Sequence, residues 1–193
     1  MNRYLFFLML LCGVALASAE EQNKKDWIFY DAFLGLEGGD AYPWGDLEDV
    51  IKPALYGQGE FSYHYWENTF GLVQFGYAYF RTHDDFKRFP GVHQFNGRVG
   101  LEHQSSWMKP FFVGAGFSCI WTRSDGGDPN DKSPGVLLIT NETEFGAFIK
   151  LKLPIWKNET YAMGVNLYWE EIWTLPKASN TLWIGFFVQR RLW

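Results

Sequence analysis

Cysteine, charged residues and long apolar runs are all scarce in this 193-residue chain, and each scarcity excludes a class of protein. Of the two cysteines, Cys12 lies in a segment that we expect to be removed, so Cys119 has no partner for an internal disulfide. No later segment has about 18 consecutive apolar residues, which excludes a transmembrane helix. The net charge is −5, so no basic surface favours nucleic acid as a partner.

Residues 1–19 have the three parts of a secretory signal peptide. Arg3 supplies a positive charge, residues 4–16 form an apolar segment too short to span a bilayer, and residues 17–19 are small, as the cleavage positions require. Leu11 precedes Cys12 where a lipoprotein signal needs a small residue, so we expect cleavage without lipidation. We therefore predict a signal peptide at 1–19 and a single domain at 20–193.

Aromatic residues are abundant, and they suit a membrane environment. Ten Trp, ten Tyr and eighteen Phe make up 20% of the chain, which fits a soluble domain of this size poorly. A barrel with an aromatic girdle at each membrane interface needs such a composition. Trp193 follows an apolar stretch at 182–188. Outer-membrane barrels typically end on an aromatic residue, so we predict that Trp193 belongs to the signal for barrel insertion.

Eight segments alternate between two faces with the period of a β-strand, and each is long enough to cross a membrane when tilted. In the clearest of them, Gln94, Asn96 and Arg98 alternate with Phe95 and Val99. The predicted strands are residues 26–38, 55–66, 69–82, 92–104, 109–123, 136–153, 160–171 and 180–193.

The connections between these segments alternate in length. Short ones at 67–68, 105–108 and 154–159 separate longer polar ones at 39–54, 83–91, 124–135 and 172–179. This is typical of the periplasmic turns and extracellular loops of an outer-membrane barrel. We therefore predict an all-β fold, an eight-stranded antiparallel up-and-down transmembrane β-barrel.

A soluble secreted sandwich or lipocalin-like barrel is the structural alternative, because it shows a comparable alternation with apolar residues inside. Period alone does not decide which face is inner. Glycines such as Gly100, Gly116 and Gly164 share the expected inner face with charged residues, which favours a narrow polar lumen.

The segment at 109–117, Lys-Pro-Phe-Phe-Val-Gly-Ala-Gly-Phe, is similar to a Pro-aromatic-Val-Gly-x-Gly strand of small outer-membrane barrels. The chain resembles the eight-stranded group that contains the outer membrane protein A barrel and its X- and W-type relatives. This resemblance implies a bacterial outer-membrane location, contact with lipid and lipopolysaccharide, and insertion by the barrel-insertion machinery. The terminal signature departs from the family, since Arg191 and Gln189 stand where apolar residues are usual. A bulge near 189–190 would restore the pattern.

The inner face of the predicted barrel carries many ionisable groups. An eight-stranded barrel has an interior that side chains just fill, and unpaired charges there are costly, so we expect a paired network that closes the lumen. The alternative is a narrow channel for cationic or small apolar solutes. The residues predicted to face inward are Asp31, Glu37, Glu60, His64, Arg98, Glu102, Glu142, Glu144, Lys150, Lys152 and Glu170.

His103 and Ser105 form a possible catalytic pair. Their spacing puts both side chains on the lipid-facing side of a strand, where a histidine can activate a serine toward a lipid ester. The segment resembles the His-x-Ser segment of outer-membrane phospholipase A and of lipid A deacylases, although Ser106 stands where those families have asparagine. A polar pair at a membrane interface needs no catalytic explanation, and we favour that interpretation.

Two loops offer possible binding sites. Asp125, Asp128 and Asp131 have the oxygen ligands that calcium prefers, but not the EF-hand spacing, so we favour a solvated turn and expect no metal or cofactor. Residues 39–54 combine acidic and aromatic side chains, which suits either a partner-binding surface or a solvated cap, and 124–135 is a second candidate surface. We expect a monomer with a structural or surface-interaction role and no chemistry of its own.

Overall fold

The computed structural model describes residues 31–66, 68–83, 91–124, 141–173 and 178–192. The predicted signal peptide, Trp193 and the three loop aspartates Asp125, Asp128 and Asp131 lie outside these ranges. Within them, no helix is long and apolar enough to cross a membrane.

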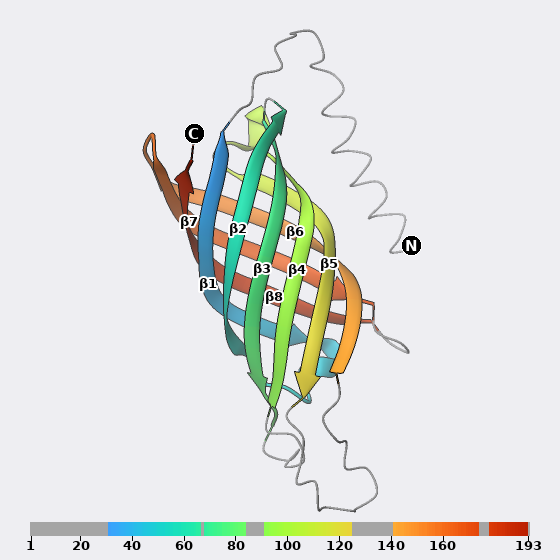
Figure 1. The fold of residues 1–193 in the computed structure, drawn as a ribbon. Helices are drawn as coiled ribbons and strands as arrows, with labels where there is room; N and C mark the ends of the chain where they lie inside the picture. Colours follow the sequence, from blue (N-terminus) through green and yellow to red (C-terminus); the bar gives the residue numbers. More distant parts are fainter. Residues whose placement is uncertain (1–30, 67, 84–90, 125–140, 174–177, 193) are drawn as a thin grey trace, which may run out of the picture.

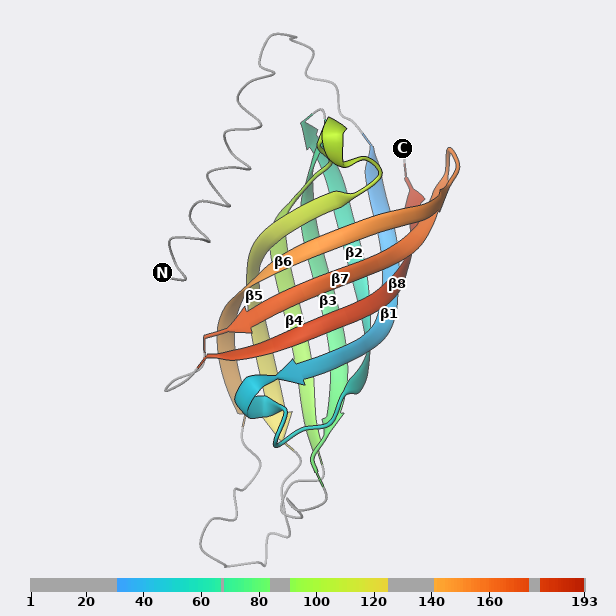
Figure 2. The same ribbon diagram turned by 180° about the vertical axis from the view of Figure 1, so that it is seen from behind.

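Eight antiparallel strands form a closed barrel in which each strand pairs with its neighbours in sequence and β1 closes against β8 (Figure 1). This confirms the predicted fold. Seen from behind, β6, β7 and β8 run side by side obliquely across the barrel wall (Figure 2). The strands are β1 (Ala32–Trp44), β2 (Ala54–Trp66), β3 (Thr69–Arg81), β4 (Gly91–His103), β5 (Phe112–Ser124), β6 (Asn141–Lys157), β7 (Tyr161–Ile172) and β8 (Ser179–Arg191).

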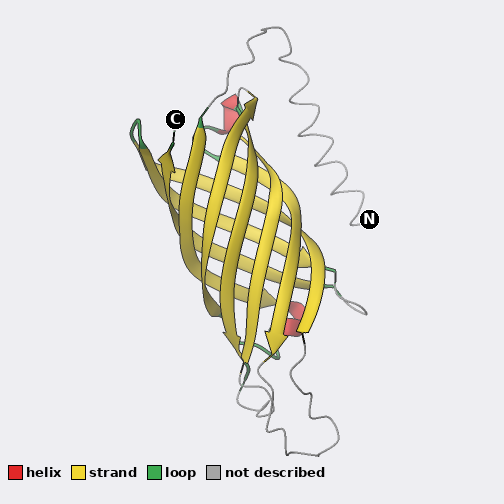
Figure 3. Cartoon of the chain, viewed as in Figure 1, coloured by secondary structure: helices red, strands yellow, loops and turns green. Residues whose placement is uncertain are grey.

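The two ends of the barrel differ. Strand β1 begins and β8 ends at the same end, together with the short β2–β3, β4–β5 and β6–β7 connections; we call this the turn end. The other is the loop end. Two short 3₁₀ helices lie at opposite ends, η1 (Gly45–Leu47) at the loop end and η2 (Ser106–Met108) at the turn end (Figure 3).

Strand β1 lies further along the chain than predicted. The predicted strand ended at residue 38 and the first loop began at Gly39, but Gly39 and Asp40 pair with β2 on one side and β8 on the other. Glycine is needed there for close approach rather than for turning, because a Cβ on Gly39 would collide with the backbone of Ile184. The first loop is therefore residues 45–53 instead of 39–54.

Strand β6 also extends beyond its prediction. Pro154 was expected to begin a turn, yet it lies inside β6 beside a β-bulge between Pro154 and Trp156. Proline has no N–H to donate to the ladder, so such an irregularity accommodates it. The turn instead begins at Asn158, whose side-chain oxygen accepts hydrogen bonds from the backbone N–H groups of Thr160 (2.9 Å) and Tyr161 (2.7 Å). By contrast, the bulge considered near 189–190 is absent, since β8 keeps a continuous register with both neighbours across those residues.

The barrel has apolar residues outside and polar residues inside. On the outer face, Leu36 is 73% exposed, Phe75 71% and Phe186 71%, whereas Arg98, Lys150 and Glu170 are buried within the lumen. This distribution of apolar and polar side chains is the opposite of that in a soluble barrel. It agrees with the faces predicted for β4 and β5. Exposed Trp and Tyr side chains gather near the ends: Tyr42, Trp44, Tyr77, Trp121, Trp169 and Trp173 at the loop end, and Tyr65, Trp107, Trp156 and Tyr161 at the turn end.

The height of the outer apolar band suits a bilayer. Along β4 the outer face runs from His93 to His103, about 33 Å of strand at about 3.3 Å per residue. With a tilt of about 40°, this corresponds to a band about 25 Å tall, the height found in outer-membrane barrels. The Nδ1 of His93 hydrogen-bonds the Tyr77 hydroxyl at 2.8 Å, so the band has a polar contact at its loop end.

Glycines on the inner wall make room for Phe148. Gly100 and Gly116 face each other across β4 and β5. A Cβ on Gly116 would lie 2.6 Å from the Gly100 Cα and 2.9 Å from the Phe148 ring, which is fully buried. Backbone and ring would both have to shift.

We predict that Gly116→Ala lowers the free energy of unfolding by about 1–3 kcal/mol, the usual cost of overpacking. Gly59→Ala is the matched control, because it adds the same methyl group to a strand glycine with nothing within 4 Å of the new Cβ. Urea unfolding of the refolded protein in lipid vesicles measures both. Equal stability of the two variants would contradict this account of the inner wall.

Candidate functional site

A bidentate ion pair joins two strands across the lumen. Arg98 of β4 donates from Nε to Glu170 Oε1 at 2.9 Å and from Nη2 to Glu170 Oε2 at 2.7 Å. Both side chains are fully buried. The remaining terminal nitrogen, Nη1, donates to Gln58 Oε1 at 2.6 Å. Such charge-assisted pairs are the strongest hydrogen bonds in proteins, so they fix β4 relative to β7.

Two lysines of β6 hold three more carboxylates. Lys150 Nζ lies 2.5 Å from Glu102 Oε1 and 3.3 Å from Glu37 Oε1, and it also pairs with Glu60. Lys152 Nζ lies 2.6 Å from Glu60 Oε1 and 3.6 Å from Glu102 Oε2. Because the carboxylates come from β1, β2 and β4, these pairs connect strands that are far apart in sequence.

Tyr168 lies at the centre of this network. Its hydroxyl donates to Glu37 Oε2 at 2.5 Å and accepts hydrogen bonds from Gln58 Nε2 at 3.0 Å and Gln74 Nε2 at 2.6 Å. Gln74 Nε2 also donates to Glu60 Oε2 at 2.8 Å. Sequence analysis did not select these neutral residues. For Gln58 and Tyr168 the signal was present, because they share the inward register of Glu60 and Glu170 on their strands. Strand β3, which carries Gln74, has no predicted network member.

An aromatic layer closes the lumen between the network and the loop end. Trp183 packs edge-on against Tyr56, with ring centroids 5.1 Å apart, and against Phe80 at 6.3 Å. The Arg98 guanidinium lies 4.7 Å from the centroid of the Trp183 ring, so a cation–π contact joins the two layers. Trp183, Phe80 and Phe148 are at most 1% exposed. The described side chains therefore fill the middle of the barrel.

The structure brings together most of the predicted lumen residues in one network, and the others lie outside that network. Glu37, Glu60, Arg98, Glu102, Lys150, Lys152 and Glu170 form the network described above. Asp31 instead pairs with Arg191 at the turn end, with both side chains partly exposed. His64 stacks on Phe70, with ring centroids 4.7 Å apart. Glu142 is exposed and Glu144 half-buried near the start of β6, where the strand passes beyond the filled part of the barrel.

His103 and Ser105 do not share a strand. Strand β4 ends at His103, and Ser105 precedes η2 as its N-cap residue. The imidazole Nδ1 of His103 is hydrogen-bonded to Thr69 Oγ1 at 2.9 Å on the outer face of the barrel. The strand on which the catalytic hypothesis depended therefore ends at His103, before Ser105. Hydrolysis of a lipid ester by this pair stays a hypothesis that no observation here favours.

The loop end has a shallow hollow of about 730 Å³ beside the first loop. Its walls include Tyr42, Trp44, Glu48 and Asp49, which come from the acidic and aromatic segment singled out in the sequence, together with His83. Backbone hydrogen bonds from Lys52 N to Arg81 O and from His83 N to Val50 O attach this loop to the end of β3. Among the described residues, no group of three or more His, Cys, Asp or Glu is placed to hold a metal ion.

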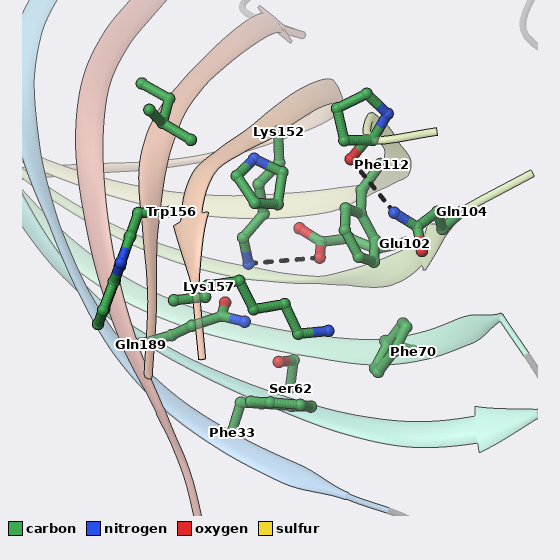
Figure 4. A pocket seen from close by; sticks show the side chains of 14 residues that line it. Phe33, Ser62, Phe70, Glu102, Gln104, Phe112, Lys152, Trp156, Lys157 and Gln189 are labelled. Atoms are coloured by element: carbon green, nitrogen blue, oxygen red, sulfur yellow. Dashed lines mark hydrogen bonds and ion pairs between the residues drawn. The ribbon is translucent and has the colours of Figure 1, made fainter. Parts of the chain in front are cut away.

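The turn end holds a smaller cavity of about 200 Å³ inside the barrel (Figure 4). Aromatic rings form part of its wall, with Phe70 packed edge-on against Phe33 at 6.0 Å and against Phe112 at 5.8 Å between centroids. Lys152 and Glu102 of the central network lie at its inner end. Among the described residues, buried side chains therefore fill the middle of the barrel, and a hollow lies at each of its two ends.

Known proteins match this chain in structure but not in sequence. No protein-family model matches the chain, and no curated protein matches it. The crystal structure of Neisserial surface protein A superposes with a TM-score of 0.57 at 10% identity, covering 82% of this chain and 96% of that one. The crystal structure of the attachment invasion locus protein Ail of Yersinia pestis has a TM-score of 0.53 at 8% identity, covering 86% and 100%. The fold of this chain is that of the small eight-stranded outer-membrane β-barrels.

Proposed function

We propose that this protein is a bacterial outer-membrane barrel with a closed lumen, whose role is structural or is exercised through the surface at its loop end. The observation that carries the proposal is the filled interior. A layer of ion pairs around Lys150 and Arg98 lies directly beneath an aromatic layer around Trp183, and both are buried. A conducting path would have to pass through both layers.

The outer face supports the membrane location. Apolar side chains form a band about as tall as a bilayer's hydrocarbon region, and Trp and Tyr residues border it at both ends. With its termini and short turns in the periplasm, the barrel would present its longer loops outside the cell. Contact with lipid and lipopolysaccharide follows from that placement, as does delivery by the barrel-insertion machinery.

The loop-end hollow is the surface best suited to a partner. Loops held on a rigid scaffold often carry binding functions, and this one combines the carboxylates of Glu48 and Asp49 with the exposed rings of Tyr42 and Trp44. Two backbone hydrogen bonds attach this loop to the end of β3.

We predict that the refolded protein produces no stable single-channel conductance in planar bilayers, because charge pairs and aromatic rings occupy the whole cross-section. A porin in the same bilayers controls for detection, and a folded-state shift on unheated gels controls for correct folding. Reproducible conductance steps from the folded fraction would overturn the closed lumen and favour the narrow-channel alternative.

A further inference from the structure

The cavity at the turn end has the size and lining of a small-molecule site, and this goes beyond the function proposed above. Its volume is about 200 Å³, and cavities of about 150 Å³ with apolar walls accommodate a single benzene ring. The rings of Phe33, Phe70 and Phe112 line it, with Pro110 and Pro154 beside them. A single ring with a short polar substituent matches this space.

The β6 bulge puts a lysine at the cavity. Across the bulge, Lys157 pairs with Ala162, which is buried on the inner face of β7, so Lys157 lies on the inner face as well. An unbroken strand would give Lys157 the opposite orientation from Lys152 and Pro154. Figure 4 shows the Lys157 side chain reaching across the cavity above Ser62, with its ammonium directed toward Phe70.

The charge of Lys157 is available to a ligand. Lys152, deeper in the cavity, is already paired with Glu60 at 2.6 Å and lies near Glu102 at 3.6 Å. Lys157 is exposed, and its side chain makes no ion pair or hydrogen bond with any residue in the described part of the chain. The wall also contains Gln189, whose Oε1 is buried and has no hydrogen-bond partner among the described residues.

We propose that the turn-end cavity binds a small organic acid with an aromatic or similarly compact apolar body. The carboxylate pairs with the Lys157 ammonium at the open end, and the body packs against the three phenylalanine rings. Gln189 Oε1 accepts a hydrogen bond from a ligand hydroxyl or from Lys157 itself. In the proposed orientation the cavity opens to the periplasm, and because the lumen above it is filled, the ligand is retained there rather than transported.

The test uses three probes that share one ring and differ only in charge, namely benzoate, benzyl alcohol and benzylammonium. Binding to the refolded full-length protein in a non-ionic detergent is measured by ligand-observed NMR and titration calorimetry. Benzoate should bind more tightly than the alcohol, and benzylammonium should not bind. Lys157→Gln should weaken benzoate binding by about tenfold, as expected for loss of a charge-assisted contact.

Two further variants keep the result interpretable. Lys109→Gln removes an exposed lysine at the same end but outside the cavity lining, so benzoate affinity should stay within about twofold. Ala162→Leu adds bulk to the cavity wall and should abolish binding of both benzoate and benzyl alcohol. Equal benzoate affinity for Lys157→Gln and the unmodified protein would overturn the proposal, as would benzylammonium binding as tightly as benzoate or no benzoate binding at millimolar concentration.

Discussion

Replacing Arg98 with methionine is expected to lower the free energy of unfolding by about 3–5 kcal/mol, the usual cost of removing one partner of a buried ion pair. Methionine keeps much of the side-chain volume but removes the guanidinium. Glu170 would then be buried without its bidentate partner, and Gln58 Oε1 would lose its donor. The cation–π contact with Trp183 would also be lost.

Two controls separate the buried charge from simple loss of packing. The double variant Arg98→Met with Glu170→Leu should recover most of the lost stability, because no uncompensated charge remains. Arg191→Met makes the same substitution in the exposed pair with Asp31, and we expect a change of about 0–1 kcal/mol. Urea unfolding in lipid vesicles, followed by tryptophan fluorescence, measures all three. A double variant as unstable as Arg98→Met alone would contradict this explanation.

Placing an arginine on the outer face should be the second most damaging change. Val99 is 55% exposed and lies near the middle of β4, so in a bilayer its side chain would meet hydrocarbon. We expect Val99→Arg to lower the free energy of unfolding by about 2–4 kcal/mol in lipid vesicles, the cost measured for arginine near the midplane of barrels.

The same substitution at the rim provides the control. Tyr65 is also exposed on the outer face, but near the turn-end boundary of the apolar band. Tyr65→Arg should therefore cost only about 0–1 kcal/mol. On a soluble barrel both positions would be ordinary surface sites, where substitutions usually change stability by less than about 0.5 kcal/mol. Equal small effects at Val99 and Tyr65 would therefore argue against the membrane location.

Local sequence pattern separated the two faces of each strand, and the charged residues and glycines on one face indicated that it was the inner one. Alternation with period two is a property of each strand alone, so Arg98 and Val99 could be assigned to opposite faces without knowledge of any neighbouring strand. The number of strands and the order of turns and loops followed from the same pattern. Tyr168, Gln58 and Gln74 were missed because neutral side chains on an inner face give no sign of which charged group they will meet.

Strand bounds depended on contacts that sequence does not show. Gly39 has the appearance of a turn residue, and only its close approach to the backbone of Ile184 reveals that it belongs inside β1. Pro154 also indicated a turn, because proline has no N–H to donate to a strand pair. The pairing of β6 with β7 nevertheless continues past it through a bulge. In both cases a local preference lost to long-range pairing, because a barrel closes only when every strand has two partners.

By itself, therefore, the sequence determined the fold, the two faces and most of the acidic and basic groups of the lumen, since each depends on residue type and spacing along one strand. Only the tertiary structure decided that Arg98 pairs with Glu170, that Trp183 covers them, and that a bulge puts Lys157 on the inner face at the turn-end cavity. These pairings depend on strand register and barrel closure, which bring together side chains from strands distant in the chain.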